Sequence, residues 1–325
     1  MAMEDQNPKA KALDLDAVLA KAENDLAAAE GQHCGLVALV GRPNVGKSTL
    51  MNYLLGEKLS ITSDKPQTTR HSILGICTRA PYQIVFVDTP GMHSKEPRSL
   101  NRYMNRAARA STAEADLAVM VVEALTWTKA DLKALTTVAQ SGIPFGLAIN
   151  KIDKLKDRSK LLPWIQQMTT ELDYNFEFIV PLSAQQGDNL EPLVEEIGKH
   201  LPEAAWMFPP EQITDRSERF MVAEIIREKL IRTLHQELPY ATAVEVDFFR
   251  EEEDGIHIGA TIWVERDGQK GIVIGKNGRV LKSVGSRARQ DIERLLGQHV
   301  FLETWVKVRD NWTDDERALR NFGFE

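Results

Sequence analysis

The residues best suited to chemistry in this chain lie in a glycine-rich segment that follows an apolar run. From Gly41 to Ser48 the letters GRPNVGKS match the phosphate-binding loop pattern G-x-x-x-x-G-K-[ST] at every defined position. Gly41 and Gly46 allow close backbone approaches that a Cβ would block, so N–H groups can face a phosphate. Lys47 can bridge β- and γ-phosphate oxygens, and the Ser48 hydroxyl can bind Mg²⁺. The loop residues predicted to bind the nucleotide are Gly41, Asn44, Val45, Gly46, Lys47, Ser48 and Thr49.

Further ligands for the phosphates and the metal are expected downstream of this loop. Asp88 and Gly91, in the sequence DTPG, follow an apolar run, so that the carboxylate can hold Mg²⁺ through a water and the glycine N–H can face the γ-phosphate. The segment 64–71, DKPQTTRH, offers a threonine hydroxyl to Mg²⁺. Spacing alone leaves Thr68 and Thr69 open, and we favour Thr69. The predicted catalytic residues are Lys47, Thr69 and Gly91, and the predicted metal ligands are Ser48, Thr69 and Asp88.

The N-K-x-D sequence at 150–153 is interpreted as the part of the site that selects the base. A carboxylate only accepts hydrogen bonds, and guanine presents two donors side by side, N1–H and the 2-amino group. Adenine would leave Asp153 unpaired, which is a strong basis for rejection. Asn150 would contact N7 or brace the loops, and the stem of Lys151 would lie over the base. The motif therefore predicts GTP and GDP as ligands.

Ser183 and Ala184 follow a further apolar run at 178–180. In that place the backbone N–H of Ala184 can reach guanine O6, while Ser183 braces the loop. The sequence S-A is a weak signal by itself, and its position after the other motifs supports it. The residues predicted to contact the base are Asn150, Lys151, Asp153, Ser183 and Ala184.

These motifs all follow apolar runs that alternate with amphipathic stretches. Strands are expected at 36–40, 72–78, 83–87, 117–122, 143–149 and 178–180. Helical patterns fill the intervals near 100–113, 129–141, 157–173 and 189–200. The alternation predicts a doubly wound α/β sheet of the P-loop NTPase class, with its ligand loops at the carboxyl ends of the strands.

The second half of the chain carries a different pattern. Three prolines mark 202–214, PEAAWMFPPEQIT, as a linker. The expected elements after it are a helix that is capped within 214–217 and runs to about Gln236, strands at 242–248 and 256–264, a helical pattern from 279 to about Leu296, and a strand at 300–308.

Basic residues gather around the G-K-N-G sequence at 275–278. Between Arg266 and Arg289 seven basic residues face one acidic residue, a net charge of +6 within a chain of formal net charge −7. The order αββ–GxxG–αβ resembles a type II KH domain, an α+β RNA-binding fold whose GxxG loop lies along about four single-stranded nucleotides. Apolar residues at 272–274 would form the wall on which bases rest. The predicted RNA-binding residues are Ile274, Gly275, Lys276, Asn277, Gly278 and Arg279.

The five nucleotide motifs in this order resemble the translation-factor-related GTPases, and GRPNVGKS with QTTR and DTPG resembles the branch that contains the Era family. The stretches ITDRSERFMVAEIIREKL, VERDGQKGIVIGKNG and WTDDERALRNFG extend the resemblance over residues 35–325. It implies GTP hydrolysis with Mg²⁺ and binding to 16S ribosomal RNA near its 3′ end during 30S subunit assembly. It also implies some peripheral contact with the inner membrane, and a potassium ion near Asn44.

Two features depart from the related patterns. Met92 stands where Ras-type enzymes place the glutamine that orients the attacking water, and a thioether cannot do this. Slow intrinsic hydrolysis is therefore expected. Residues 1–34 carry seven acidic residues and three lysines, and they form either a short amphipathic helix or a loosely held acidic tail.

Net charge and composition limit the functional classes to which the chain can belong. The net charge of −7 argues against general attraction to nucleic acid, so an RNA site must be a local basic patch. The two cysteines, Cys34 and Cys77, have neither metal-ligand spacing nor enough partners for a disulfide framework, so we expect a cytoplasmic protein. No apolar run approaches the ~18 residues that span a bilayer, and a monomer is the default. The expected division is an acidic extension at 1–34, a GTPase domain at 35–201, a linker at 202–214 and a KH domain with its tail at 215–325.

Three functional hypotheses remain at this point. In the first, an enzyme uses its GTP state to control RNA engagement. In the second, the protein is a GTP-regulated RNA-binding scaffold whose hydrolysis is incidental, for which Met92 is the best support. In the third, the protein is a P-loop kinase that acts on a small molecule. Asp153 argues against this hypothesis, because its carboxylate selects guanine.

Overall fold

The computed structural model describes residues 31–61, 73–88, 114–234 and 242–322 of the 325-residue chain, and every structural statement below concerns these residues. Several predicted features lie outside them: the residues Thr68, Thr69, Gly91 and Met92, the helix near 100–113, and nearly all of the acidic extension.

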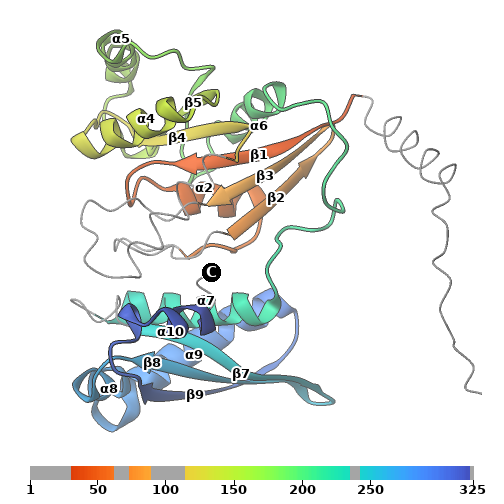
Figure 1. The fold of residues 1–325 in the computed structure, drawn as a ribbon, viewed down its shortest axis with the longest axis vertical. Coiled ribbons are helices and arrows are strands. Elements are labelled where there is room, and N and C mark those ends of the chain that lie inside the picture. Colours follow the sequence, from red (N-terminus) through yellow and green to blue (C-terminus); the bar gives the residue numbers. More distant parts are fainter. Residues whose placement is uncertain (1–30, 62–72, 89–113, 235–241, 323–325) are drawn as a thin grey trace, which may run out of the picture.

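The first half of the chain forms a six-stranded sheet with strand order β2-β3-β1-β4-β5-β6 (Figure 1). Its strands are β1 (His33–Val40), β2 (Ile73–Arg79), β3 (Tyr82–Asp88), β4 (Leu117–Glu123), β5 (Phe145–Asn150) and β6 (Ile179–Pro181). Its helices are α2 (Lys47–Leu55), α4 (Lys129–Ser141), α5 (Leu161–Leu172) and α6 (Leu190–Lys199), with short 3-10 turns η1 (Ile152–Lys154) and η2 (Arg158–Lys160).

Helices cover both faces of this sheet, so its central strands are apolar throughout. In β1, Val37 and Leu39 pack with α2 and α6, whereas Ala38 and Val40 point to the opposite face and pack with α4 and α5. The predicted doubly wound P-loop fold is confirmed. One strand differs from a purely parallel pattern, because β2 pairs antiparallel with β3. The two residues between these strands allow only a hairpin, since a parallel crossover needs a dozen or more residues.

The second half forms a three-stranded sheet with order β7-β8-β9, in which β7 and β8 are antiparallel and β8 and β9 parallel. Its elements are α7 (Glu218–Thr233), β7 (Thr242–Glu252), β8 (Gly255–Val264), α8 (Asp267–Ile274), η4 (Lys276–Gly278), α9 (Arg279–Leu296), β9 (Val300–Val308), η5 (Trp312–Asp314) and α10 (Glu316–Asn321). This order confirms the predicted KH domain. The first helix ends at Thr233, earlier than the predicted Gln236.

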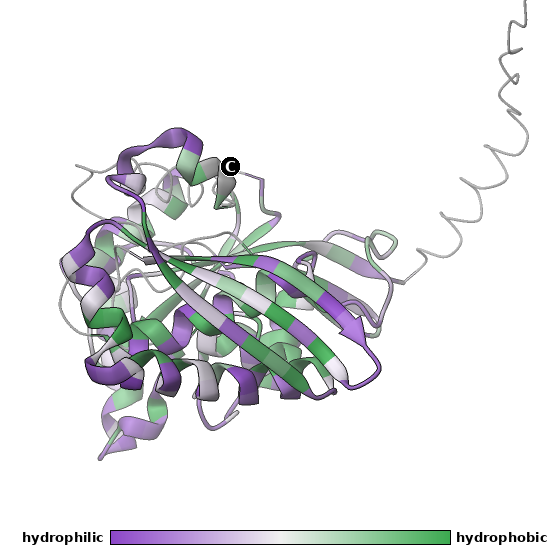
Figure 2. Cartoon of the chain, turned by 90° about the horizontal axis from the view of Figure 1, so that it is seen from below, coloured by the Kyte–Doolittle hydropathy of each residue, from purple (hydrophilic) through white to green (hydrophobic). Residues whose placement is uncertain are grey.

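Only one face of the KH sheet is covered by long helices. Apolar residues of α7 and α9 pack on that face and form a core with alternate residues of the three strands. At one end of the opposite face, Trp312 and residues of α10 pack on Ala243 and Trp263. The rest of that face is visible without a covering helix in Figure 2.

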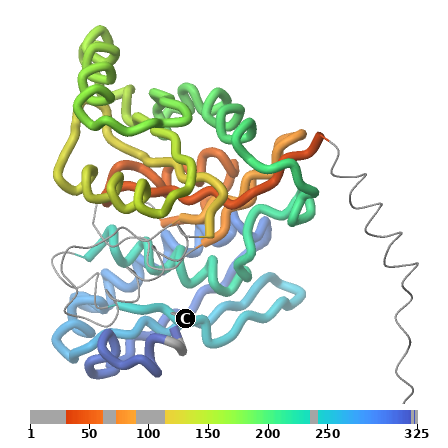
Figure 3. Tube along the Cα trace, turned by 45° about the horizontal axis from the view of Figure 1, so that its top comes forward, coloured from red at the N-terminus to blue at the C-terminus, as the bar shows by residue number. Residues whose placement is uncertain are grey.

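The segment between the two folds lies along the first sheet (Figures 1 and 3). The Ile76 N–H donates to the Ile213 carbonyl at 2.9 Å, and Gly75 forms an isolated bridge with Thr214. The Phe208 backbone exchanges two hydrogen bonds with the Gln83 side chain. The bond from Ile76 satisfies a backbone group at the exposed edge of β2, and the Gln83 bonds hold Phe208 to β3, so the segment is bound to the sheet along its course.

Candidate functional site

The phosphate-binding loop lies where β1 ends and α2 begins. Gly41 has φ of 151°, and a Cβ there would lie 2.4 Å from the Val121 carbonyl oxygen. Gly46 has φ of 106°, and its Cβ would lie 2.3 Å from Nδ2 of Asn150. Both positions therefore require glycine. The turn leads directly into the N-terminus of α2, whose positive end favours a bound anion.

Lys47, Ser48 and Asp88 converge behind this loop. Nζ of Lys47 donates to the Gly41 carbonyl at 2.9 Å, and Oγ of Ser48 donates to Oδ2 of Asp88 at 2.8 Å. Burial lowers the pKa of Lys47 below its ordinary value, and the negative charge of Asp88 opposes this shift. A hydroxyl and a carboxylate at this separation are oxygen ligands of the kind that Mg²⁺ prefers, so the pair fits the predicted metal position.

Asn150, at the end of β5, connects three loops. Its Nδ2 donates to the Val45 carbonyl at 2.8 Å, and its Oδ1 accepts from the N–H groups of Lys151 and Ala184 at 2.7 and 2.9 Å. The sequence left two roles open for this side chain, N7 contact or bracing; these bonds brace the loops, and the N7 contact stays a prediction. The predicted base-contacting N–H of Ala184 is bonded to Asn150 in this arrangement.

Asp153 is held in place by the predicted bracing residue. The buried Ser183 donates its Oγ–H to Oδ1 of Asp153 at 2.6 Å, and it accepts a hydrogen bond from the Gln186 N–H at 3.1 Å. The carboxylate at the end of this chain of bonds is half-buried. It is thus oriented by the protein and can still accept from a base.

An ion cluster beside the loop was not anticipated from the sequence. Glu123, the last residue of β4, accepts from Nζ of Lys151 at 2.8 Å and from Nη2 of Arg42 at 3.1 Å. Burial tends to raise the pKa of Glu123, but the bonds to Lys151 and Arg42 outweigh burial and lower it. Arg42 also bonds Asp131 at the start of α4, at 3.3 Å. In the sequence, the only sign of this cluster is the acidic residue Glu123 directly after a predicted strand, and no known motif includes it.

Asn44 and Thr49 complete the predicted nucleotide set. Asn44 is exposed in the loop with φ of 66°, and Thr49 is the third residue of α2. The structure therefore brings the predicted residues of the loop, β3, β5 and the 183–184 turn to one edge of the sheet. Thr69 and Gly91 lie outside the described residues.

The G-K-N-G sequence forms the turn between α8 and α9. Gly275 and Gly278 have φ of 72° and 73°, and Asn277 has φ of 52°. A Cβ on Gly275 would lie 2.4 Å from the Val280 side chain. Lys276, Asn277 and neighbouring Arg279 are exposed, so the turn offers charge and amide groups to a passing phosphate backbone.

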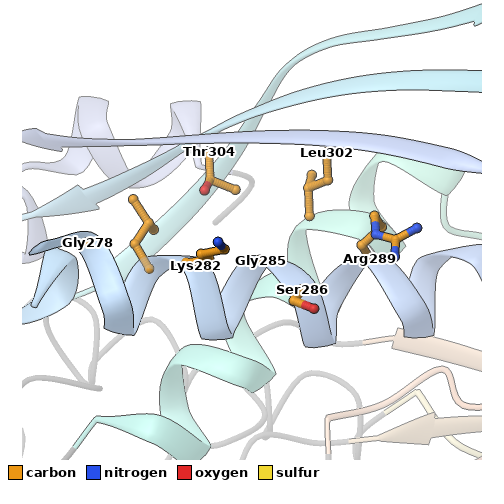
Figure 4. A pocket seen from close by; sticks show the side chains of 8 residues that line it. Gly278, Lys282, Gly285, Ser286, Arg289, Leu302 and Thr304 are labelled. Carbon is orange, nitrogen blue, oxygen red and sulfur yellow. The ribbon is translucent and has the colours of Figure 1, made fainter.

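A groove of about 410 Å³ continues from this turn between α9 and β9 (Figure 4). Leu302 and Thr304 point from β9 toward the helix, and Lys282 and Arg289 stand on the helix side. The lining residues are Gly278, Leu281, Lys282, Gly285, Ser286, Arg289, Leu302 and Thr304. The sequence pattern did not reveal this set, since α9 and β9 are brought together only by packing.

The expected apolar wall at 272–274 is partly wrong. Val273 is fully buried in the KH core, because the helical period of α8 turns it toward the sheet. Ile274 packs partly on the same core, and Ile272 is exposed. Of the predicted wall, only Ile272 and the accessible part of Ile274 can meet a ligand.

Ion pairs join the two folds at the loop after α2. Lys58, in the loop after α2, bonds Glu228 of α7 at 2.5 Å and Asp291 of α9 at 3.0 Å. Lys229 also bonds Asp291. Burial tends to raise the pKa of Asp291, and its bonds to the two lysines lower it overall. The KH helices therefore contact the chain just before residues 62–72.

Two family models match separate parts of the chain. The model described as a 50S ribosome-binding GTPase matches residues 36–151, and the KH domain model matches residues 237–313. The first range contains the phosphate loop and ends at Lys151, so it includes Asn150 but stops before Asp153. The second contains the G-K-N-G turn and the groove.

Several curated relatives match nearly the whole chain. GTPase Era of Vibrio parahaemolyticus is 50% identical over 96% of this chain and 97% of its own length. GTPase Era of Stenotrophomonas maltophilia strain K279a is 53% identical over 90% and 98%. Two solved structures each match with a TM-score of 0.86 and 39% identity over 90% of this chain and 99% of the other: a variant of Aquifex aeolicus Era bound to GDP·AlF4−, and Era in complex with MgGDPNP and nucleotides 1506–1542 of 16S ribosomal RNA.

Proposed function

The chain belongs to the GTPase Era family, and from that premise we propose that it binds and hydrolyses GTP, binds 16S ribosomal RNA near its 3′ end, and acts in 30S subunit assembly. The observation that carries the proposal is the presence, in one chain, of a guanine-nucleotide site and a basic KH groove. The related structure with MgGDPNP and the 16S fragment supports the pairing of these two ligands.

Hydrolysis requires water to attack the γ-phosphorus as its bond to the β–γ bridging oxygen breaks. In this proposal the backbone of the phosphate loop and Lys47 hold the β- and γ-phosphates, and charge developing on them is stabilised by the buried ammonium group. Thr69 and Gly91 are proposed to complete the site. The Met92 thioether cannot orient the water, so the intrinsic rate should be low.

Mg²⁺, when bound, would neutralise charge on the β- and γ-phosphate oxygens. Ser48 and Asp88 are the described residues proposed to hold it, with Thr69 as a third ligand. Their hydrogen bond of 2.8 Å places both oxygens close enough to share one ion. A potassium ion near Asn44 stays a prediction based on family resemblance.

Guanine selection is assigned to Asp153. The bond from Ser183 occupies one oxygen and fixes the plane of the carboxylate, which leaves lone pairs for the donors of the base. Asn150 acts mainly as a brace between the loops, and the Lys151–Glu123–Arg42 ion cluster positions the Lys151 stem. The kinase hypothesis has no support in this arrangement.

The RNA is proposed to cross the G-K-N-G turn and enter the groove between α9 and β9. The exposed Lys276 and Arg279 supply charge to the phosphates, and Gly275 and Gly278 let the backbone approach. Bases would then lie on Leu302 and Thr304, while Ser286 and Arg289 offer polar contacts. This reading replaces most of the wall expected at 272–274.

Control of RNA engagement by nucleotide is supported by contacts on both sides of residues 62–72. Before that segment, Lys58 pairs with Glu228 and Asp291 of the KH helices. After it, the Leu74 N–H donates to Asp215 at 3.3 Å, and the segment that leads into α7 pairs with β2. A change in the position of the chain around Thr69 would therefore reach α7 from two directions. Particle binding that is indifferent to the bound nucleotide would instead favour the scaffold hypothesis.

Domain limits, location and assembly belong to the same proposal. We place the GTPase domain at 35–201, the linker at 202–214 and the KH domain at 215–325. No helix in the described ranges is long and apolar enough to cross a membrane. A cytoplasmic location and a monomeric state stay predictions from the sequence, and peripheral inner-membrane contact stays a prediction from the family resemblance.

RNA crosslinking in cells tests the proposal directly. Wild-type crosslinks should concentrate near the 3′ end of 16S RNA, and the variant Lys276→Asp/Asn277→Asp should lose them while it still hydrolyses GTP. Crosslinks elsewhere, or crosslinks that survive the double substitution, would refute the RNA assignment and leave the GTPase assignment intact.

A further inference from the structure

The open face of the KH sheet carries aromatic side chains whose position does not serve the RNA groove. Leu302, Thr304 and other alternate residues of β9 face α9, so Phe301, Glu303 and Trp305 point to the opposite side. Phe301 and Trp305 are 38% and 40% exposed, and both are large apolar side chains on the same face of one strand.

The neighbouring strands extend this aromatic surface. Phe248 of β7 lies opposite Gly259 of β8, where a Cβ would come within 2.2 Å of the phenyl ring. The missing side chain lets the ring lie across the sheet, with its centroid 6.3 Å from that of Trp305. On the other side, His257 stacks on Phe301 at 4.5 Å. Together these four rings form what we call the aromatic face.

Carboxylates outnumber cations around the aromatic face, although Lys307 of β9 lies over the Trp263 ring at 5.6 Å. Residues 245–254 of β7 and its turn include six acidic residues and one basic residue, Arg250. Glu245 and Asp247 lie on the same side as the rings, since they bond Trp263 and Thr261 of β8. The G-K-N-G side of the domain carries a net +6 between Arg266 and Arg289, so the domain has oppositely charged faces.

This charge distribution decides which partner can occupy the face. Phosphate backbones would be repelled, although exposed rings on a sheet otherwise suit base stacking. The acidic residues near the N-terminus of this chain carry the same sign of charge as the face, and they too would be repelled. The aromatic face suits cations: Arg250 already lies over the Phe248 ring at 5.2 Å.

We propose that the aromatic face binds a lysine- and arginine-rich segment of a protein partner. Guanidinium groups of that segment would stack on Trp305 and Phe301, and its remaining cations would pair with Glu303 and the carboxylates of the β7–β8 turn. A KH domain bound to RNA by its basic side would present this acidic side outward. In an RNA–protein particle, basic protein segments are then the complementary surface.

A fluorescein-labelled oligo-arginine peptide tests this with the full-length chain. Anisotropy should report binding that salt weakens, and an oligo-glutamate peptide of equal length should not bind. Phe301→Ala/Trp305→Ala should weaken the oligo-arginine affinity about tenfold, as expected for two lost cation–π contacts. The matched control is Leu132→Ala/Leu162→Ala, which removes side chains of 43% and 64% exposure from the GTPase domain and should change nothing.

Two further variants separate this surface from the RNA groove. Glu303→Lys changes only an exposed charge, should fold normally, and should weaken peptide binding roughly threefold or more. Lys276→Asp/Asn277→Asp should lose single-stranded RNA and keep the peptide, whereas both face variants should keep RNA. Equal peptide affinity in wild type and both face variants would overturn the proposal. So would loss of RNA binding in the face variants, or a dimer in sedimentation that the face variants dissociate, because these would assign the face to RNA or to a second copy.

Discussion

The two sheets of this protein build their binding sites in opposite ways. The GTPase sheet is covered on both faces, so polar groups reach a ligand only at the strand ends, where Asp88, Glu123 and Asn150 are the last residues of β3, β4 and β5. The KH sheet is covered on one face, and its groove runs along the side of β9.

This difference changes how the site residues are held. In the nucleotide site, buried groups fix one another: Asn150 bonds the phosphate loop and the 183–184 turn, and Ser183 bonds Asp153. In the KH site, Lys276 and Asn277 are exposed on a turn defined by glycines. Single substitutions should therefore cause large losses of binding or activity in the nucleotide site and smaller, partial losses of binding in the KH site.

The largest effect is expected for Lys47→Ala. Loss of the buried ammonium group should lower GTP hydrolysis by about a hundredfold to a thousandfold, because no other described group can replace its charge between the phosphates. Single-turnover hydrolysis measures this, with Lys129→Ala, an exposed lysine at the start of α4, as control. RNA affinity without nucleotide should be unchanged. Normal hydrolysis by Lys47→Ala would contradict the role of the buried ammonium group and the expected severity of substitutions in the nucleotide site.

Asp153→Asn should come next. The amide cannot accept from both guanine donors, so GTP affinity should fall roughly a hundredfold, and xanthine nucleotides should bind better because their 2-oxo group accepts. The Ser183 bond can still form to the amide oxygen, so the loop should keep its shape. Titration with labelled GDP and XDP measures this change in preference from guanine to xanthine. The exposed Asp157→Asn is the control, and unchanged guanine affinity at position 153 would reject the base assignment.

Gly285→Ala sharpens the comparison on the KH side. A helix-interior glycine costs about 1 kcal/mol relative to alanine, and a Cβ here would meet only Oγ1 of Thr304, at 3.9 Å. The variant should therefore unfold at a higher denaturant concentration, yet bind single-stranded RNA several-fold more weakly, since the methyl group enters the groove. Gly268→Ala, which lies in α8 outside the groove lining, should not weaken binding. Increased stability with full RNA affinity would mean that bases do not use this part of the groove.

The smallest effect is expected for Lys58→Met, which keeps the apolar stem and removes the charge that joins the two folds. The ratio between the RNA affinities of the GDP-bound and the GDPNP-bound protein should shrink by about two- to fivefold, because the two sites lose one of their connections. Calorimetric RNA titrations in both states measure this, with the exposed Lys133→Met as control. An undiminished difference between the states would leave the β2 pairing as the route of coupling, whereas equal RNA affinities of the wild type in both states would favour the scaffold hypothesis.

Much of the molecule was readable from the sequence because local spacing constrains it. Apolar runs and their period predicted the strands of both sheets, and G-x-x-x-x-G-K-S, N-K-x-D and G-K-N-G each place several ligand groups within a few residues. Such groups meet a ligand together once a strand end or a turn forms. Helix ends were less certain, as Thr233 shows, because tertiary packing decides where the last turn stops.

Tertiary structure decided everything that depends on residues distant in the chain. Glu123 meets Arg42 and Lys151 only because β4 lies between β1 and β5. Lys58 meets Asp291 only through the packing of the two folds. The groove and the aromatic face are the two sides of β9, and the alternation of side chains was visible in the sequence. Which side α9 would cover was not, because that choice is made by burial of the helix against the whole sheet.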